Sequence, residues 1–232
     1  FSSSPALGSG MLYIHVNNLH AFDVKTGRKM WEASQKNAWG SPLYAEIGGL
    51  GVVMSAAGDI LRASDGKKLT DRPLNYLQFN SPVYVEGVLY FIQTKSSAHR
   101  LKRNGDGLDI SELWKQTLPK DRYYAAPLIH NGLVYDVTRK GVMTVLDAGD
   151  GSEVYTHTFK YGKGEMYPSP TLLNDRIFFG HEKGMIALLK PGREFELLNE
   201  FRFVPFRACP VAAENRLYFK SLDTLYCIGT SN

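Results

Sequence analysis

A small residue followed by proline recurs six times along the chain at nearly constant intervals. The six pairs are Ser4-Pro5, Ser41-Pro42, Ser81-Pro82, Ala126-Pro127, Ser169-Pro170 and Cys209-Pro210. Consecutive prolines are separated by 37, 40, 45, 43 and 40 residues. This period is typical of the blades of a β-propeller, in which one repeat forms one sheet and needs its neighbours to bury both of its faces.

Each repeat contains several short apolar runs separated by turn residues. The turns between the first two runs are Gly8-Ser9-Gly10, Glu86-Gly87, Asn131-Gly132, Asn174-Asp175 and Glu214-Asn215. Two apolar runs around such a turn indicate a β-hairpin. A third run follows in each repeat, and in most of them an Asp/Thr/Gly turn leads to a fourth. We therefore predict an all-β propeller of four-stranded antiparallel blades with almost no helix, in a single domain 1–232. Its repeats are expected at about 1–36, 37–77, 78–122, 123–164, 165–204 and 205–232.

Composition excludes several classes of protein. Of the 232 residues, 44% are hydrophobic and 22% are charged, which is enough to form a core. The net charge is only +4 and no basic run exceeds two residues, so a nucleic-acid partner is not expected. No run of about 18 apolar residues occurs, so direct membrane insertion is not expected either.

The two ends of the chain bear on the number of blades. The first repeat begins directly at its innermost strand, and the last ends after its third. Propellers avoid such an open sheet edge by completing the last blade with a strand from the other terminus. We therefore expect the parent protein to continue upstream of Phe1 with the closing strand, one or two further blades and an export signal, which would make a seven- or eight-bladed ring.

The pattern within the repeats resembles that of a known family. It reads Ser-Pro, then Leu-Tyr, then Leu-x-Ala-Phe-Asp, then Thr-Gly-Arg and Trp, and it is best preserved from Ser4 to Trp31. This resembles the pyrroloquinoline quinone (PQQ) repeat in all six units, although repeats two, three and five are degenerate and repeat three carries the insert Asn104-Gly105-Asp106-Gly107. The resemblance implies a PQQ-like β-propeller that is either periplasmic or secreted. Such propellers include quinoprotein alcohol or sugar dehydrogenases, non-catalytic scaffolds similar to the lipoprotein of the outer-membrane β-barrel assembly machinery, and extracytoplasmic sensors.

The dehydrogenase alternative would require PQQ with calcium, carboxylate and amide ligands, and an Asp base. The aspartates that the sequence offers lie mostly in predicted turns: Asp23, Asp65, Asp147, Asp150 and Asp175. The spacing Asp147-x-x-Asp150-x-Ser152 is interpreted as a turn. Five histidines are scattered without metal-ligand spacing: His15, His20, His99, His130 and His157. We therefore predict no catalytic residue, no metal ligand and no cofactor.

The two cysteines are not adjacent, unlike those of many PQQ dehydrogenases. Cys209 is placed on the first strand of repeat six and Cys227 on the third, about two interstrand spacings or ~9.6 Å apart. That separation excludes a disulfide, so both are expected to be buried free thiols. Trp31 and Trp114, near the outer strands, are expected to pack between blades.

A candidate binding site lies where the loops entering each blade meet the loops between second and third strands, at the channel mouth. The position three residues before each proline holds Ser2, Trp39, Phe79, Tyr124, Tyr167 and Arg207. The other loops add Arg139, Lys140, His181 and Lys183. An aromatic and locally basic mouth would suit an acidic peptide segment, an oligosaccharide or a flat anionic ligand. The alternative is that the aromatics only wedge neighbouring blades and the cations are solvated loop tips.

Function is therefore predicted as follows. The chain is expected to be a non-catalytic binding or scaffold module outside the cytoplasm, with a protein or carbohydrate partner at the channel mouth or the blade sides. The alternatives are a fragment of a PQQ- and calcium-dependent dehydrogenase, and a carbohydrate-binding or sensor domain. Truncating Trp39 or Tyr167 to Ala is expected to abolish binding and leave the fold intact.

Overall fold

The computed structural model describes residues 3–213 and 216–229, and the chain divides into two compact units, Phe1–Thr117 and Leu118–Asn232. Every helix-or-strand element among the described residues is a β-strand, and these strands form six antiparallel sheets. No helix long and apolar enough to cross a membrane occurs in the described ranges. The all-β prediction is confirmed.

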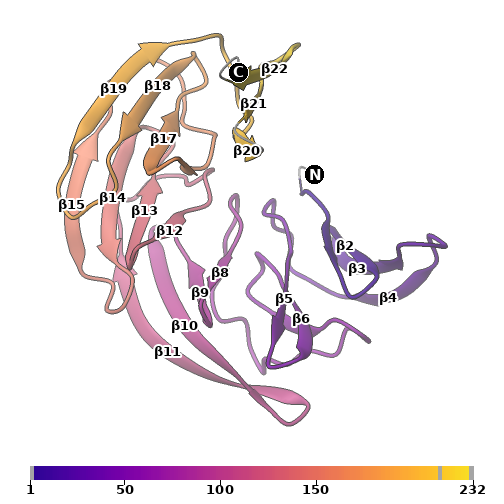
Figure 1. The fold of residues 1–232 in the computed structure, drawn as a ribbon. Coiled ribbons are helices and arrows are strands. Elements are labelled where there is room, and N and C mark those ends of the chain that lie inside the picture. Colours follow the sequence, from indigo (N-terminus) through magenta and orange to yellow (C-terminus); the bar gives the residue numbers. More distant parts are fainter. Residues whose placement is uncertain (1–2, 214–215, 230–232) are drawn as a thin grey trace. The chain divides into compact units, whose positions relative to one another are not determined.

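The first unit contains three sheets, each an up-and-down meander in chain order (Figure 1). The first sheet consists of β1 (Ala6–Gly8), β2 (Met11–Val16), β3 (Asn18–Asp23) and β4 (Lys29–Ala33). The second consists of β5 (Leu43–Ile47), β6 (Leu50–Met54) and β7 (Ile60–Arg62). The third consists of β8 (Val83–Val85), β9 (Val88–Phe91), β10 (Lys95–Asn104) and β11 (Gly107–Thr117).

The second unit repeats this plan (Figure 1). The fourth sheet consists of β12 (Leu128–His130), β13 (Leu133–Val137), β14 (Val142–Asp147) and β15 (Glu153–Thr158). The fifth consists of β16 (Thr171–Leu173), β17 (Arg176–Gly180), β18 (Met185–Leu189) and β19 (Leu197–Arg202). The sixth consists of β20 (Val211–Ala213), β21 (Arg216–Lys220) and β22 (Leu225–Gly229).

The hairpin turns lie where the sequence predicts them. Asn131 and Gly132 join β12 to β13 with φ angles of 48° and 71°. Two successive left-handed residues make the turn whose twist matches antiparallel strands, and Asn and Gly tolerate that conformation best. The predicted turn Glu214-Asn215 lies outside the described residues. The insert of repeat three forms the tip of the long β10–β11 hairpin, where Asn104 pairs with Gly107.

The second sheet departs from the four-stranded prediction. Beyond β7, only an isolated bridge between Leu61 and Lys68 continues the ladder, and no fourth strand forms there among the described residues. The following residues are Asp71, Arg72 and Pro73. Proline has no N–H to donate to a ladder, and it also restricts the residue before it. An outer strand therefore cannot continue through this segment.

Alternation along the strands buries both faces of the inner sheets. In the second sheet, Val53 and Leu61 pack with Tyr13 of the first sheet. The next residues along these strands, Val52 and Ile60, pack against the third sheet. In the second unit the same arrangement gives a core between the fourth and fifth sheets and another between the fifth and sixth. Each sheet thus depends on its neighbours for its core, as the repeat pattern predicts.

The predicted role of Trp31 between blades is confirmed. Its ring packs in the core between the first and second sheets, and its Nε1–H donates to the Ala63 carbonyl at 2.9 Å. Trp114 on β11 is also buried, beside Tyr90 of the same sheet.

At four of the repeat prolines, the residue before the proline links one repeat to the next. Its backbone N–H donates to the side chain at the same position one repeat later. The bonds are Ser4 to Ser41 Oγ at 2.8 Å, Ser41 to Ser81 Oγ at 2.9 Å, Ala126 to Ser169 Oγ at 2.9 Å, and Ser169 to Cys209 Sγ at 3.2 Å. We call these bonds the interblade clasps.

The cysteines are free, but the prediction that they are buried is wrong. Both thiols are exposed. Cys209 precedes β20 rather than lying on it, because its position before Pro210 belongs to the loop that carries the clasp. Cys227 lies on β22, which pairs only with β21 among the described residues, so no outer strand covers its side chain.

Candidate functional site

The candidate site residues of the first unit are Trp39 and Phe79. Their ring centroids are 6.4 Å apart with an interplanar angle of 49°. The side chain of Trp39 remains 52% exposed. Its backbone is held firmly, because the Trp39 N–H donates to the Gln78 carbonyl at 2.8 Å. The neighbouring Gly40 lies so close to the Asn80 carbonyl that a Cβ there would fall 1.9 Å from its oxygen. This loop therefore presents a large aromatic ring on a fixed backbone.

The candidate aromatics of the second unit stack on one another. Tyr124 and Tyr167, at equivalent positions of consecutive repeats, have ring centroids 4.8 Å apart and nearly parallel planes. The guanidinium of Arg207, at the equivalent position of the next repeat, lies 4.7 Å from the Tyr167 centroid. We call these three residues the tyrosine–arginine stack. Since Tyr167 is covered by a neighbour on each side, it serves at least partly as the interblade wedge that the alternative interpretation predicts.

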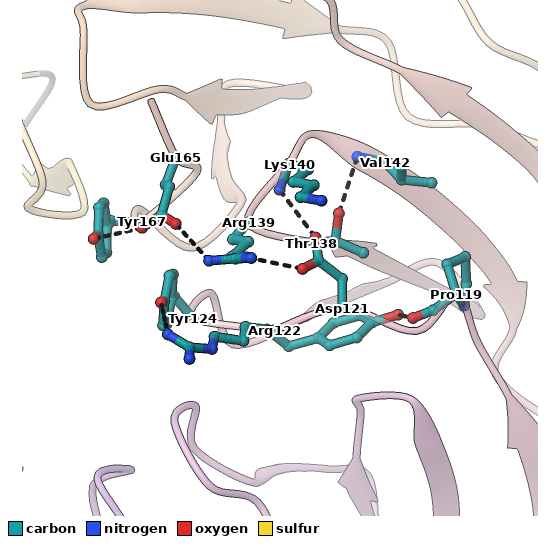
Figure 2. A network of polar contacts seen from close by, with 11 residues as sticks. Pro119, Asp121, Arg122, Tyr124, Thr138, Arg139, Lys140, Val142, Glu165 and Tyr167 are labelled. Atoms are coloured by element: carbon teal, nitrogen blue, oxygen red, sulfur yellow. Dashed lines mark hydrogen bonds and ion pairs between the residues drawn. The ribbon is translucent and has the colours of Figure 1, made fainter. Parts of the chain in front are cut away.

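A network of polar contacts surrounds Arg139 (Figure 2). The guanidinium bonds Asp121 Oδ1 through Nε and Glu165 Oε1 through Nη1, both at 2.9 Å. The other Glu165 oxygen accepts from the Tyr167 hydroxyl at 2.7 Å. The backbone N–H of Lys140 donates to Asp121 Oδ2 at 3.3 Å. The network thus joins the entering loops of the fourth and fifth sheets to the β13–β14 loop.

The pKa values of the network follow from these contacts. Burial alone would raise the pKa of Asp121, but hydrogen bonds from the Arg122 backbone and from Arg139 outweigh burial and lower it. The carboxylate of Glu165, together with burial, raises the pKa of Tyr167 to about 12. Asp121 and Arg139 therefore form an ion pair, and Tyr167 stays protonated as a donor.

Acidic residues neutralise the two arginines. Glu182 Oε2 accepts from Nε and Nη2 of Arg207 at 3.0 and 2.8 Å. With Arg139 held by Asp121 and Glu165, neither arginine is an unpaired cation on the rim. Sequence reasoning missed these three acids. The available signal was their position, since Glu165 is two residues from Tyr167 and Glu182 lies between two candidate residues.

The remaining candidates divide into surface and interior. Lys140 and Lys183 are exposed, and no ion pair to either ammonium group forms among residues 3–213 and 216–229. His181 is 3% exposed. Its Nδ1 accepts from the Lys183 N–H at 3.3 Å, and burial lowers its pKa. His181 therefore positions the β17–β18 loop as a neutral ring, although its sequence position suggests a rim residue.

The acids considered for calcium are engaged in their own turns. Asp147 accepts from the Gly149 N–H at 3.0 Å and pairs with Arg193 at 2.9 Å. Asp150 accepts from the Ser152 N–H at 2.8 Å. Within the described part of the chain, no three His, Cys, Asp or Glu side chains gather as a metal site would require. These residues do not fit the calcium of a PQQ enzyme.

Comparison with known proteins gives a family and several similar structures. The family model described as outer membrane protein assembly factor BamB matches residues 15–193. No sequence among the curated proteins matches significantly. The structure of BamB from Moraxella catarrhalis is similar with a TM-score of 0.73 and 14% identity, over 94% of this chain and 68% of that one.

Two further structures share the fold. The quinohemoprotein alcohol dehydrogenase ADHIIG from Pseudomonas putida HK5 has a TM-score of 0.62 and 11% identity, over 88% of this chain and 42% of that one. Sqt1 from Saccharomyces cerevisiae has a TM-score of 0.67 and 9% identity, over 90% of this chain and 65% of that one. At such identities the similarity shows the fold alone, which is that of a partial β-propeller.

Proposed function

Because the chain belongs to the PQQ-repeat family described as outer membrane protein assembly factor BamB, we propose that it is a non-catalytic propeller scaffold that binds a partner protein outside the cytoplasm. The family match is the observation that carries this proposal. It spans residues 15–193 and therefore most of the chain. The similar structure of BamB from Moraxella catarrhalis agrees with the propeller fold of this family.

Trp39 is the side chain proposed to contact the partner. It is half exposed, rests on Phe79 and has a backbone tied to Gln78. Tryptophan is enriched among residues that dominate binding energies, because a large rigid ring loses little entropy when it is covered. In the second unit, Arg207 covers one face of Tyr167 and is itself 60% exposed, so it offers a second contact surface.

Within the part of the chain that the structure describes, no group of residues supports the dehydrogenase alternative. Asp147 and Asp150 use their carboxylates within a turn and in a pair with Arg193. The similarity to ADHIIG lies at 11% identity and extends over 42% of that enzyme. A carbohydrate partner, which could also stack on Trp39, is distinguished from a protein partner by the experiment below.

Site-directed crosslinking tests this proposal. A photoreactive phenylalanine analogue placed at position 39 should form a covalent adduct with a partner protein when cells that produce the protein are irradiated. Val24 provides the matched control, because it is 53% exposed, in the turn after β3. An adduct of a defined mass at position 39, absent at position 24, supports the scaffold. Equal adducts at both positions, or none at either, would overturn the proposed contact, and a glycan adduct would favour the carbohydrate alternative.

A further inference from the structure

A hollow of about 410 Å³ lies beside the network of Figure 2, within the second unit. One wall is formed by Lys140 and Gly141 of the β13–β14 loop, and another by His181 of the β17–β18 loop. The segment 159–166, which follows β15, supplies the rest of the lining. We call it the lysine hollow, because Lys140, Lys160 and Lys163 line it.

The lysine hollow is held in shape by hydrogen bonds at both ends of the segment 159–166. The Phe159 N–H donates to the Gly141 carbonyl at 2.9 Å, and the Met166 N–H donates to the Arg139 carbonyl at 2.9 Å. In the middle, the Tyr161 hydroxyl donates to Glu200 Oε2 at 2.8 Å. The segment is therefore fixed to the β13–β14 loop and to β19. A ligand would meet a preformed surface and pay little to order it.

Four cations gather here. Lys140, Lys160 and Lys163 line the hollow, and the stem of Lys183 lies against Gly164 beside it. All four are exposed, and no ion pair to their ammonium groups forms within the described residues. Two of the three nearby acids are paired with arginines, since Glu165 binds Arg139 and Glu182 binds Arg207. The third, Glu200 on β19, accepts from the Tyr161 hydroxyl.

The interior of the hollow adds apolar surface but no negative charge. Phe159 and Met166 are buried, and the Tyr161 ring stacks on Phe159 at 5.5 Å. The ring of Tyr161 also lies edge-on to His181, whose pKa is lowered by burial. A matching ligand therefore carries several negative groups that face the lysines, and it can place a small apolar group against Phe159 and Tyr161.

We propose that the lysine hollow binds an acidic peptide segment of the partner protein, and this proposal rests on the scaffold function above. The four ammonium groups come from three separate loops, so the positive charge is distributed around the rim. Several carboxylates spaced along an extended chain match that distribution better than one compact anion. Lysines act as point charges, which suits several separate carboxylates without a fixed bidentate geometry.

A peptide-binding measurement tests the lysine hollow. The probe is a fluorescein-labelled peptide of alternating Glu and Gly residues, and its Gln-Gly counterpart serves as the uncharged reference. Fluorescence anisotropy should detect binding of the Glu-Gly probe only, and this binding should weaken as salt screens the charges. The double variant Lys160→Glu/Lys163→Glu should bind the probe at least about tenfold more weakly, since each reversal replaces attraction by repulsion.

The matched control variant is Lys25→Glu/Lys102→Glu. It makes the same change in net charge with two exposed lysines of the first unit. The control should bind within about twofold of the unsubstituted protein, because neither Lys25 nor Lys102 lines the hollow. Equal weakening in both variants would show that only net charge attracts the probe and would overturn the proposal. Unchanged thermal unfolding of all variants confirms that they remain folded.

Three further outcomes separate this proposal from the alternatives and from the proposed function. If inorganic phosphate binds in a calorimetric titration and the Glu-Gly probe does not, the hollow belongs to a phosphorylated ligand and the peptide proposal fails. If the crosslink at position 39 forms but the unsubstituted protein does not bind the probe, the scaffold function is supported and the proposal for the lysine hollow fails. If the probe binds but position 39 gives no adduct, the hollow is supported and the Trp39 contact fails.

Discussion

The backbone N–H of Ser41 donates to Oγ of Ser81, the residue at the same position one repeat later, at 2.9 Å. The clasp gives a physical reason for a small residue with a hydrogen-bonding side chain before most of the repeat prolines. The proline fixes the backbone of the loop, and the short side chain before it reaches the preceding sheet. The motif is therefore a bond between sheets as well as a mark of the strand that follows.

Replacing Ser81 with Ala should destabilise the protein by about 1 kcal/mol, because the partly buried Ser41 N–H loses its acceptor. Urea unfolding of the variant and the parent measures this difference. Ser111→Ala is the control, since Ser111 is exposed on β11 and its hydroxyl makes no hydrogen bond in the described structure. Equal losses in the two variants would contradict a specific role for the clasp.

Cys209 allows the same bond to be tested with a different acceptor. Its Sγ accepts from the Ser169 N–H at 3.2 Å, and sulfur is a weak acceptor. Cys209→Ser should therefore equal or exceed the parent in stability, whereas Cys209→Ala should lose a few tenths to about 1 kcal/mol. If Ala proves as stable as Ser, the sulfur contact contributes nothing.

The exposure of the thiols gives an independent prediction. Cys209 and Cys227 should both react with iodoacetamide in the native protein, because both are exposed. Intact mass spectrometry under non-reducing conditions should show two alkyl groups added without denaturant. A thiol that reacts only after unfolding would contradict the exposed position of that cysteine.

The sequence predicts the repeat architecture well because its signals are local. Asn131-Gly132 encodes a turn within two residues, and the six regularly spaced prolines predict the number of sheets. The missing outer strand of the second sheet was also readable, since Pro73 cannot donate to a ladder. The exposure of Cys209 was harder to anticipate, because it depends on whether the strand begins before or after the proline.

The candidate site was less predictable because its contacts join distant residues. Arg139 pairs with Asp121 and Glu165, which are 18 and 26 positions away. The basic character expected of Arg139 and Arg207 disappears once these acids are placed. The lysine hollow likewise depends on which acids are already occupied, and no local pattern records that.

Asp136 predicts a dependence of stability on pH. This residue of β13 is 1% exposed, and neither carboxyl oxygen has a partner within the described residues. Burial raises its pKa to about 8. The folded state therefore keeps a proton that the unfolded state releases above its ordinary pKa near 3.8. The contribution of Asp136 to the stability of the folded state should therefore be greatest below pH 3.8 and should fall as the pH rises to about 8.

The variant Asp136→Asn measures this effect, because its side chain stays neutral at every pH. Between pH 5 and 7, the stability of the parent relative to the variant should fall by about 1.4 kcal/mol per pH unit. Urea unfolding at several pH values provides the measurement. Asp71→Asn, which makes the same substitution at an exposed position, is the matched control. A constant difference between Asp136→Asn and the parent would mean that Asp136 is already ionised in the folded state.

Trp39 and Tyr167 should respond differently to truncation, although the sequence predicts that both leave the fold intact. Trp39→Ala removes a half-exposed ring and should change stability by less than about 1 kcal/mol while abolishing the crosslinked partner's binding. Tyr167→Ala removes the stack on Tyr124, the contact with Arg207 and the hydrogen bond to Glu165.

The loss for Tyr167→Ala should reach about 2 kcal/mol, because stacking and cation–π contacts each contribute about 0.5–1.5 kcal/mol. Tyr167→Phe separates the terms, since it keeps both ring contacts and loses only the hydroxyl bond to Glu165. Its stability should therefore lie between those of the parent and the Ala variant in the same urea titration. If Tyr167→Ala is as stable as the unsubstituted protein, the tyrosine–arginine stack contributes no stability between repeats. Its aromatic rings would then be available to a ligand, as the sequence analysis predicts.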